Sequence, residues 1–345
     1  MRILITGGAG FIGSNLAQRL LTRGHTITIY DNLSRPGSAH NLSWLRQVAA
    51  TLENPFVLIE GELQDAERLM LTARDTDAII HLAGQVAVTH SVRNPRDDFM
   101  SNALGTFNVL EAARLAPTNP IVIYASTNKV YGGMEHLAVT EEPTRYTYRD
   151  LPMGIDESQP LDFHSPYGCS KGVGDQYTRD YHRIYGLRTV VFRQSCCYGP
   201  RQFGVEDQGW VAHFVIAAQM GRKITIYGDG KQVRDLLYID DLLDAYELAL
   251  ERIDIAAGQI YNIGGGAAHA LSIWVEFEPL LSRLAGHRIV PNQYGDWRPG
   301  DQPVFISDIG KAGRELGWLP KVDPVTGIER LWSWVHAHRS LFEGH

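Results

Sequence analysis

Gly7-Gly8-Ala9-Gly10-Phe11-Ile12-Gly13 follows the short run Ile3-Leu4-Ile5-Thr6 at the N-terminus. The apolar run is typical of a parallel strand buried on both faces. Residues 11–23 then carry apolar side chains at helical spacing, and Gly24 ends the pattern. Glycines spaced as G-x-G-x-x-G allow a tight strand-to-helix turn and the close approach of a pyrophosphate to the helix N-terminus. A glycine turn without a ligand is the alternative, and the strand–turn–helix context disfavours it.

An acidic residue lies at the distance that dinucleotide-binding folds use. Asp31 follows a second expected strand at residues 26–30 and stands 18 positions after Gly13. A carboxylate there accepts hydrogen bonds from a ribose 2′-hydroxyl and repels a 2′-phosphate. The sequence therefore predicts NAD as the cofactor in preference to NADP, a preference that the nearby Arg35 weakens slightly.

The first half of the chain alternates strand and helix patterns. Strands are expected at residues 3–5, 26–30, 56–59, 78–82, 121–125 and 189–192, and the clearest helices at residues 11–23, 99–115 and 167–185. This alternation predicts an α/β fold with a Rossmann-like, doubly wound parallel sheet. After about residue 195 glycine and proline become frequent. We expect residues 1–195 to form the NAD-binding domain and residues 196–345 to form most of a smaller mixed α/β substrate-binding lobe, with segments crossing between the two.

The composition is that of a globular protein. Hydrophobic residues make up 44% and charged residues 21% of the chain. A length of 345 residues is ample for a sizeable core. A net charge of −7 argues against a nucleic-acid or membrane-surface partner. The apolar stretches are too short for a signal peptide or a transmembrane helix, and three cysteines do not make a disulfide framework. We therefore expect a cytoplasmic protein.

Two titratable side chains share one face of the helix expected at residues 167–185. Tyr167 and Lys171 are four positions apart. A phenol titrates near pH 10, too high for a base at neutral pH, but a neighbouring ammonium and a nicotinamide cation both favour the phenolate. Thr127 follows the strand expected at residues 121–125, where open α/β sheets bind ligands. These three residues are the candidate catalytic residues, and an exposed Tyr–Lys pair is the alternative.

The order of these motifs resembles the extended short-chain dehydrogenase/reductase family of nucleotide-sugar enzymes. The resemblance covers nearly the whole chain, and its further segments are His81-Leu82-Ala83-Gly84, Asn102-Ala103-Leu104-Gly105-Thr106, Ser165-Pro166-Tyr167-Gly168, Gly228-Asp229-Gly230 with Arg234-Asp235, and Arg298-Pro299-Gly300-Asp301. It implies an NAD-dependent enzyme that acts on a nucleotide sugar.

The resemblance also implies a role for each matching position. The residues that would bind NAD are Gly7, Gly10, Phe11, Ile12, Gly13, Asp31, Asn32, Ser34, Arg35, Glu62, Leu63, Leu82, Ala83, Gly84, Gln85, Asn102, Ala125, Ser126, Tyr167, Lys171, Gln194 and Ser195. Glu62 replaces an Asp that usually meets the adenine amino group. The residues that would contact substrate are Gln85, Thr127, Asn128, Lys129, His164, Ser165, Cys196, Arg201, Gln202, Gln208, Tyr227, Arg234, Arg298 and Asp301. Arg234 and Arg298 would hold the diphosphate, and for His164 a packing role in the loop is the alternative.

Departures from the family pattern narrow the reaction. Sugar 4,6-dehydratases carry an Asp-Glu pair directly after the active-site Thr, where this chain has Asn128 and Lys129, so elimination is not expected. Segments 84–87, 126–132, 144–147, 161–171, 199–203, 207–210 and 230–235 resemble the CDP-tyvelose (CDP-paratose) 2-epimerase branch. That branch implies oxidation of a CDP-hexose at C2, rotation of the 2-keto sugar and reduction of its other face. Tyr167 would take the hydroxyl proton, Thr127 would orient the hydroxyl, and Lys171 would lower the tyrosine pKa.

Two other functions stay open on the sequence. One is a UDP- or GDP-sugar 4-epimerase, and the other is a non-catalytic NAD-binding regulator, which the intact Tyr167 and Lys171 disfavour. The family pairs through helices that match residues 99–115 and 167–185, which implies a homodimer or homotetramer. No metal site is expected, because the neighbouring histidines His336 and His338 are two positions apart and lie on different faces of a helix.

Overall fold

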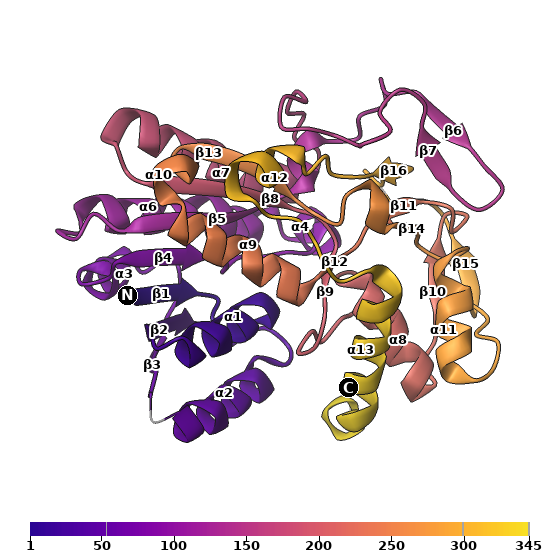
Figure 1. Ribbon diagram of the computed structural model, residues 1–345, viewed down its shortest axis with the longest axis horizontal. Coiled ribbons are helices and arrows are strands. Elements are labelled where there is room, and N and C mark those ends of the chain that lie inside the picture. The colour runs from indigo at the N-terminus through magenta and orange to yellow at the C-terminus, as the bar shows by residue number, and fades with distance from the viewer. Residues whose placement is uncertain (53, 299, 344–345) are drawn as a thin grey trace.

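A seven-stranded parallel sheet lies at the centre of the computed structural model, which describes residues 1–52, 54–298 and 300–343 (Figure 1). Its strands, in the order β13-β8-β5-β4-β1-β2-β3, are β13 (Gln259–Ile263), β8 (Thr189–Gln194), β5 (Ile121–Thr127), β4 (Ala78–His81), β1 (Arg2–Thr6), β2 (Thr26–Asp31) and β3 (Val57–Glu60). The chain runs outward from β1 in both directions, so the strand order reverses there and a crevice opens at the carboxyl ends. The doubly wound sheet is confirmed, and each expected strand lies within two residues of its predicted bounds.

The two faces of the sheet are buried by different helices. Ile3 and Ile5 of β1 belong to one core cluster, and Leu4 between them belongs to another. The first cluster includes side chains from α1 (Phe11–Thr22), α2 (Ser38–Leu52), α9 (Ile239–Glu251) and α12 (Gly310–Leu316). The second includes side chains from α3 (Ala66–Ala73), α6 (Gly105–Leu115) and α7 (Ser165–Tyr185). Burial on both faces explains why the strands are continuous apolar runs.

The helices predicted at residues 99–115 and 167–185 differ from their predictions in the first turn. The segment expected as one helix at residues 99–115 begins as a π-helical stretch, Phe99–Leu104, and continues as α6. α7 begins at Ser165, two residues earlier than expected, and has Pro166 in its first turn, where proline's missing N–H costs nothing. The short helices α4 (Val88–Arg93) and α5 (Pro95–Asp98) precede the π-helical stretch.

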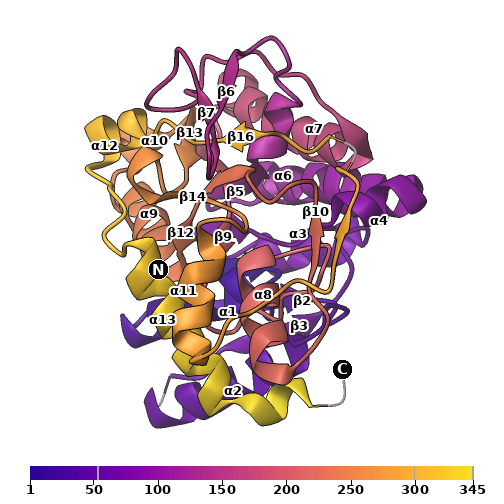
Figure 2. The ribbon, with the colours of Figure 1, turned by 90° about the vertical axis from the view of Figure 1, so that its right-hand side faces the viewer.

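The second half of the chain builds a smaller lobe and also returns to the sheet (Figures 1 and 2). β13, α9, α12 and α10 (Ile253–Ala256) from this half lie with the sheet. The lobe itself contains α8 (Trp210–Met220), β10 (Thr225–Tyr227), β11 (Val233–Asp235), β14 (Ala270–Ser272), α11 (Phe277–Ala285), β15 (Gln293–Gly295), β16 (Val304–Phe305) and α13 (Pro324–Ala337). β10 pairs with β15, and β11 lies between β14 and β16. β9 (Cys197–Tyr198) and β12 (Leu237–Tyr238) pair at the junction.

A long excursion between β5 and α7 joins the smaller lobe. It contains the hairpin of β6 (Val139–Glu141) and β7 (Tyr146–Tyr148). The Tyr146 hydroxyl donates to Asp229 at 2.6 Å, and Ile155 pairs with Ser307. The described part of the chain also contains three 3-10 turns: Asn128–Tyr131, Ala267–His269 and Arg339–Phe342. Within the described residues, no helix combines the length and apolarity needed to cross a bilayer.

Candidate active site

The glycine turn between β1 and α1 has no room for side chains. Gly7 adopts a φ of +72°, and a Cβ on it would lie 2.7 Å from the backbone nitrogen of Ala83, which follows β4. A Cβ on Gly13 would lie 2.2 Å from the Gly7 carbonyl oxygen. The N-cap of α1 is Gly10, so no side chain caps the first N–H groups of this helix. These groups therefore face the crevice as donors for an anion.

Asp31 stands at the end of β2 beside this turn. Its carboxylate accepts hydrogen bonds from the backbone N–H groups of Ala9 at 2.9 Å and Leu33 at 2.8 Å. Burial raises the pKa of Asp31, and the two N–H donors oppose that shift. The neighbouring Asn32 donates its amide to both carboxylate oxygens of Glu62, at 3.1 and 3.0 Å. The two acidic groups are thus fixed at one end of the crevice.

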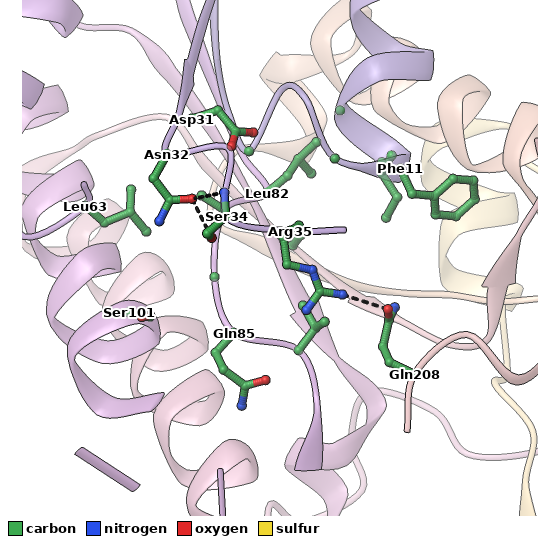
Figure 3. Close-up of a pocket in the computed structure, with 18 of the residues that line it drawn as sticks. Phe11, Asp31, Asn32, Ser34, Arg35, Leu63, Leu82, Gln85, Ser101 and Gln208 are labelled. Carbon is green, nitrogen blue, oxygen red and sulfur yellow. Dashed lines mark hydrogen bonds between the residues drawn. The ribbon is translucent and has the colours of Figure 1, made fainter. Parts of the chain in front are cut away.

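The crevice encloses a first cavity of about 630 Å³. Figure 3 shows its polar end, where Asp31, Asn32, Ser34 and Arg35 lie opposite Gln85 and Gln208. The residues predicted to bind NAD that line this cavity are Gly7, Gly10, Phe11, Ile12, Gly13, Asp31, Asn32, Ser34, Arg35, Glu62, Leu63, Leu82, Ala83, Gly84, Gln85, Ala125, Ser126, Tyr167, Lys171 and Gln194. The glycine turn lines one wall of the cavity, and the acidic groups lie at one end of it. A dinucleotide-binding site requires both features.

Two residues predicted to bind NAD lie behind the wall of the first cavity. The Asn102 amide donates to the Gln85 carbonyl at 3.0 Å and to the Asp98 carboxylate at 3.1 Å. The Ser195 hydroxyl donates to Asp235 at 2.6 Å. Neither is among the residues that line the cavity. Both side chains are hydrogen-bonded to neighbouring protein groups, and their contact with NAD stays a prediction.

Tyr167, Lys171 and Thr127 come together where β5 meets the first turns of α7. Burial raises the pKa of Tyr167 to about 12, against a hydrogen bond with Thr127 that lowers it. Burial lowers the pKa of Lys171 to about 7. The Lys171 amine donates to the Ala125 carbonyl and lies 4.4 Å from the centre of the Tyr124 ring. In this arrangement Thr127 and Arg35 lower the tyrosine pKa, and the same role for Lys171 stays a prediction.

A buried ion pair joins α7 to β8 close to the candidate catalytic residues. Asp175 lies one turn beyond Lys171 on α7, and its carboxylate meets the Arg193 guanidinium of β8 at 2.9 Å. The side chains of the pair are 0% and 3% exposed. Ser126 also donates to Asp175, at 2.7 Å. No prediction from the sequence included this pair, although the four-residue spacing of Tyr167, Lys171 and Asp175 indicates a shared helix face.

A second cavity of about 480 Å³ lies between the sheet and the smaller lobe. Of the predicted substrate contacts, Lys129, His164, Ser165, Tyr227, Arg234, Arg298 and Asp301 line it. Arg234 pairs with Asp301 and donates to the Gln302 carbonyl at 2.8 Å. Burial, with the nearby Arg234, lowers the pKa of Lys129 to about 8. Pro299 of the predicted Arg298–Asp301 motif lies outside the described residues.

The other predicted substrate contacts lie elsewhere. Gln85, Arg201, Gln202 and Gln208 line the first cavity. Thr127, Asn128 and Cys196 are not among the lining residues of either cavity. Thr127 and Asn128 are buried, with 7% and 9% of their surfaces exposed, at the start of the turn that presents Lys129. Cys196 has an unusual φ of +34° where the chain leaves β8.

Several lining residues of the second cavity were missed. They come from α4 (Val88, Thr89, Val92, Arg93), from the loop before α8 (Glu206, Asp207), from α8 (Trp210, His213, Phe214), and from Thr225 and Ile273. Only Asp207 and Trp210 lie in a segment with a sequence signal, residues 207–210. The α4 residues carried no signal, because their sequence, Val88-Thr89-His90-Ser91-Val92-Arg93, matches no chemical motif.

A family model described as GDP-mannose 4,6 dehydratase matches residues 4–331. The chain belongs to this family. Its relatives include the CDP-paratose 2-epimerase of Salmonella typhi, which is 44% identical over 345 residues covering 97% of this chain and 99% of that protein. The UDP-glucose 4-epimerase of Mycolicibacterium smegmatis is 33% identical, with 96% and 97% covered, and the dTDP-glucose 4,6-dehydratase of Streptomyces griseus is 33% identical, with 99% and 96% covered.

Solved structures of the family share the fold over the full chain. UDP-glucose 4-epimerase from Thermotoga maritima, solved with UDP-glucose, superposes with a TM-score of 0.83 at 31% identity, covering 98% of this chain and 99% of that one. A dTDP-glucose 4,6-dehydratase from Streptomyces venezuelae, solved with NAD, gives 0.83 at 30% identity, covering 99% and 98%. The predicted family and the Rossmann-like fold are confirmed. NAD is the cofactor that these structures support, as the glycine turn and Asp31 predict.

Proposed function

We propose that this protein is an NAD-dependent epimerase that inverts C2 of a CDP-linked hexose of the paratose and tyvelose type. The identity of 44% with a CDP-paratose 2-epimerase carries the proposal, because the seven 4-epimerases and dehydratases compared with this chain are 29–33% identical to it. The residues that follow Thr127 support it: Asn128 and Lys129 offer no carboxylic acid for the elimination that a dehydratase performs.

The first cavity is the proposed seat of NAD. The first turn of α1 and the glycine turn would hold the pyrophosphate, and Asp31 would accept hydrogen bonds from the adenosine ribose. Lys171 and Tyr167, at the other end of the cavity, would meet the nicotinamide ribose. NAD, when bound, supplies the hydride acceptor for the oxidation of C2 and the hydride donor for its reduction.

The proton of the C2 hydroxyl is the part of the reaction that the protein handles. Tyr167 takes this proton when the hydroxyl becomes a carbonyl, and returns it to the oxygen when the other face of the sugar is reduced. Thr127, which lowers the pKa of the Tyr167 hydroxyl, shares and orients this proton. A pKa of about 12 keeps the Tyr167 phenol protonated at neutral pH. A positive charge close to the phenol, such as an oxidised nicotinamide, would therefore activate it.

The second cavity is the proposed seat of the nucleotide sugar. Arg234 and Arg298 both line it and carry the planar donors that suit a diphosphate. Lys129, His164 and Ser165 line the end nearest to Tyr167, because Ser165 opens α7 and Lys129 follows Thr127 by two positions. The sugar would then lie between these residues and the catalytic tyrosine. Apolar side chains of α4, Val88 and Val92, form another wall.

Proton NMR with CDP-paratose tests the proposal, because the anomeric coupling reports the configuration at C2. CDP-glucose and UDP-glucose run in parallel, with Tyr167→Phe as the inactive control. Conversion of the CDP sugar to its C2 epimer is expected. Reaction of UDP-glucose alone, at C4, would replace the substrate assignment by that of a 4-epimerase and leave the catalytic residues in place.

We also infer that the chain forms at least a homodimer through α6, α7 and the π-helical stretch. Their outer faces expose Phe99 at 55%, Tyr177 at 47% and Ile184 at 65%. An apolar face of this kind is typical of an interface. The cytoplasmic location and the lack of nucleic-acid partners stay predictions from the composition.

A further inference from the structure

A short turn before α8 touches both cavities. Residues 205–208, which we call the bridging turn, read Val205-Glu206-Asp207-Gln208. Glu206 and Asp207 line the second cavity, whereas the next residue, Gln208, lines the first. The bridging turn therefore stands at the boundary between the proposed NAD site and the proposed nucleotide-sugar site.

On the first cavity, the bridging turn holds an arginine from the opposite wall. The Gln208 side-chain oxygen accepts a hydrogen bond from the Arg35 guanidinium at 2.8 Å (Figure 3). Arg35 belongs to the loop that follows β2, four residues after Asp31 at the end of that strand. The Arg35–Gln208 contact thus crosses the first cavity and joins its acidic end to the smaller lobe.

On the side of the second cavity, the bridging turn holds Arg298, one of the two arginines that we propose to bind the diphosphate. The Arg298 guanidinium donates to the Glu206 carbonyl at 3.0 Å and pairs with the Asp207 carboxylate at 3.3 Å. It also lies 4.0 Å from the centre of the Tyr227 ring, and the Tyr227 hydroxyl donates to the Glu206 carboxylate at 2.9 Å. Four residues of the second cavity are thereby tied together.

Two backbone hydrogen bonds close the bridging turn. The backbone N–H of Val205 donates to the Gln208 carbonyl at 3.0 Å, and the N–H of Gln208 donates to the Val205 carbonyl at 2.9 Å. Gly204 and Gly209 flank the turn, and Gly209 has a φ of +76°. The closed turn between two glycines transmits a shift at Glu206 to Gln208, because its ends cannot separate without losing both hydrogen bonds.

A diphosphate that binds Arg298 would replace one of its partners, Asp207, and leave the other, the Glu206 carbonyl, in place. The Asp207–Arg298 pair is partly exposed, with side chains 40% and 27% accessible, so it contributes little and a phosphate can replace the carboxylate. A guanidinium has five N–H donors, so the Glu206 carbonyl keeps its hydrogen bond when a phosphate arrives. A bound diphosphate therefore fixes Arg298 and, through the Glu206 carbonyl, the bridging turn.

We propose that the bridging turn couples the two cavities, so that a nucleoside diphosphate on Arg298 and a dinucleotide beneath the Arg35–Gln208 contact each tighten the binding of the other. This coupling rests on the proposed function, which assigns the ligands to the cavities. Reciprocity follows from thermodynamic linkage. For a reaction that oxidises and then reduces the same carbon, such coupling holds both partners in place until the second half of the reaction is complete.

Calorimetric titration measures the coupling without turnover. CDP is titrated into NAD-free and NAD-loaded protein, and NAD into CDP-free and CDP-loaded protein. We expect each ligand to bind the loaded protein at least about fivefold more tightly. In Gln208→Ala the ratio falls to one, whereas Gln208→Glu keeps it because a carboxylate also accepts from Arg35. Val205→Ala is the matched control, since the Val205 side chain is 45% exposed and only its backbone serves the turn.

The outcomes separate the coupling from the ligand assignment. If Gln208 only contacts NAD, Gln208→Ala would weaken NAD binding equally with and without CDP. The affinity ratio would then stay as in the unaltered protein, and this result would overturn the coupling. A ratio of one in the unaltered protein would overturn it as well, while leaving the two binding sites intact. Failure of the unaltered protein to bind either ligand would overturn the proposed function together with the coupling.

Discussion

At the residue scale, Tyr167 is the group on which the proposed reaction depends. Its hydroxyl is the proton carrier, while the first cavity has many other contacts for NAD. We expect Tyr167→Phe to lower kcat by roughly 10²–10⁴-fold, the usual contribution of a general acid–base group, and to cause little loss of NAD affinity. Rates from NMR and calorimetric NAD titration measure the two effects. Tyr185→Phe, at a residue 54% exposed, is the control. Full activity of Tyr167→Phe would contradict the assignment.

Also at the residue scale, the lowered pKa of Lys171 predicts that the free energy of unfolding depends on pH. Its pKa falls from 10.5 to about 7 on burial. Below pH 7 the amine is charged in both states, so the folded protein bears the full burial cost. Between pH 7 and pH 10 only the unfolded chain stays protonated, so this cost fades as pH rises. The free energy of unfolding of the unaltered protein, relative to Lys171→Met, should therefore rise by about 1.4 kcal/mol per pH unit in this window.

Urea denaturation of both proteins from pH 6 to pH 10 measures this difference. Lys321→Met is the control, because Lys321 is exposed and its pKa is raised by its contact with Asp244. A flat difference between Lys171→Met and the unaltered protein would show that Lys171 keeps its ordinary pKa in the folded state.

At the element scale, the Asp175–Arg193 pair joins α7 to β8 beneath the site. Asp175→Ala leaves a guanidinium that is 3% exposed without its carboxylate. We expect a loss of about 3–5 kcal/mol in the free energy of unfolding. Urea denaturation checks this value against Asp150→Ala, whose pair with Arg149 is 69% and 67% exposed and should contribute at most about 1 kcal/mol. Equal losses in the two variants would refute a structural role for the buried pair.

At the scale of the whole molecule, the outer face of α7 predicts the assembly. A second copy would cover Tyr177 and Ile184, which lie two turns apart on this helix. Two carboxylates buried there would oppose association, so the double variant Tyr177→Glu, Ile184→Glu should sediment as a monomer. Val290→Glu, at a residue 65% exposed in the smaller lobe, should not change the mass. Dimers of the double variant would place the interface elsewhere.

The sequence by itself determined the features that neighbouring residues encode. The glycine turn, Asp31, and the Tyr167–Lys171 pair are short motifs whose spacing sets the backbone or helix face on which they act. The alternation of apolar runs and helical patterns likewise determined the parallel sheet, because strands buried on both faces need continuous apolar runs. The substitution of Asn128 and Lys129 for two acids was visible without coordinates.

Only the tertiary structure decided which distant residues meet. β13 completes the sheet beside β8 although 64 positions separate the end of β8 from the start of β13 in the chain. Arg35 reaches Gln208 across 173 positions, and Arg298 reaches Glu206 across 92. No local pattern encodes such contacts, since they depend on where the sheet and the smaller lobe place their loops. The division of the crevice into two cavities, and the turn that bridges them, therefore came from the packing of the chain and not from any of its motifs.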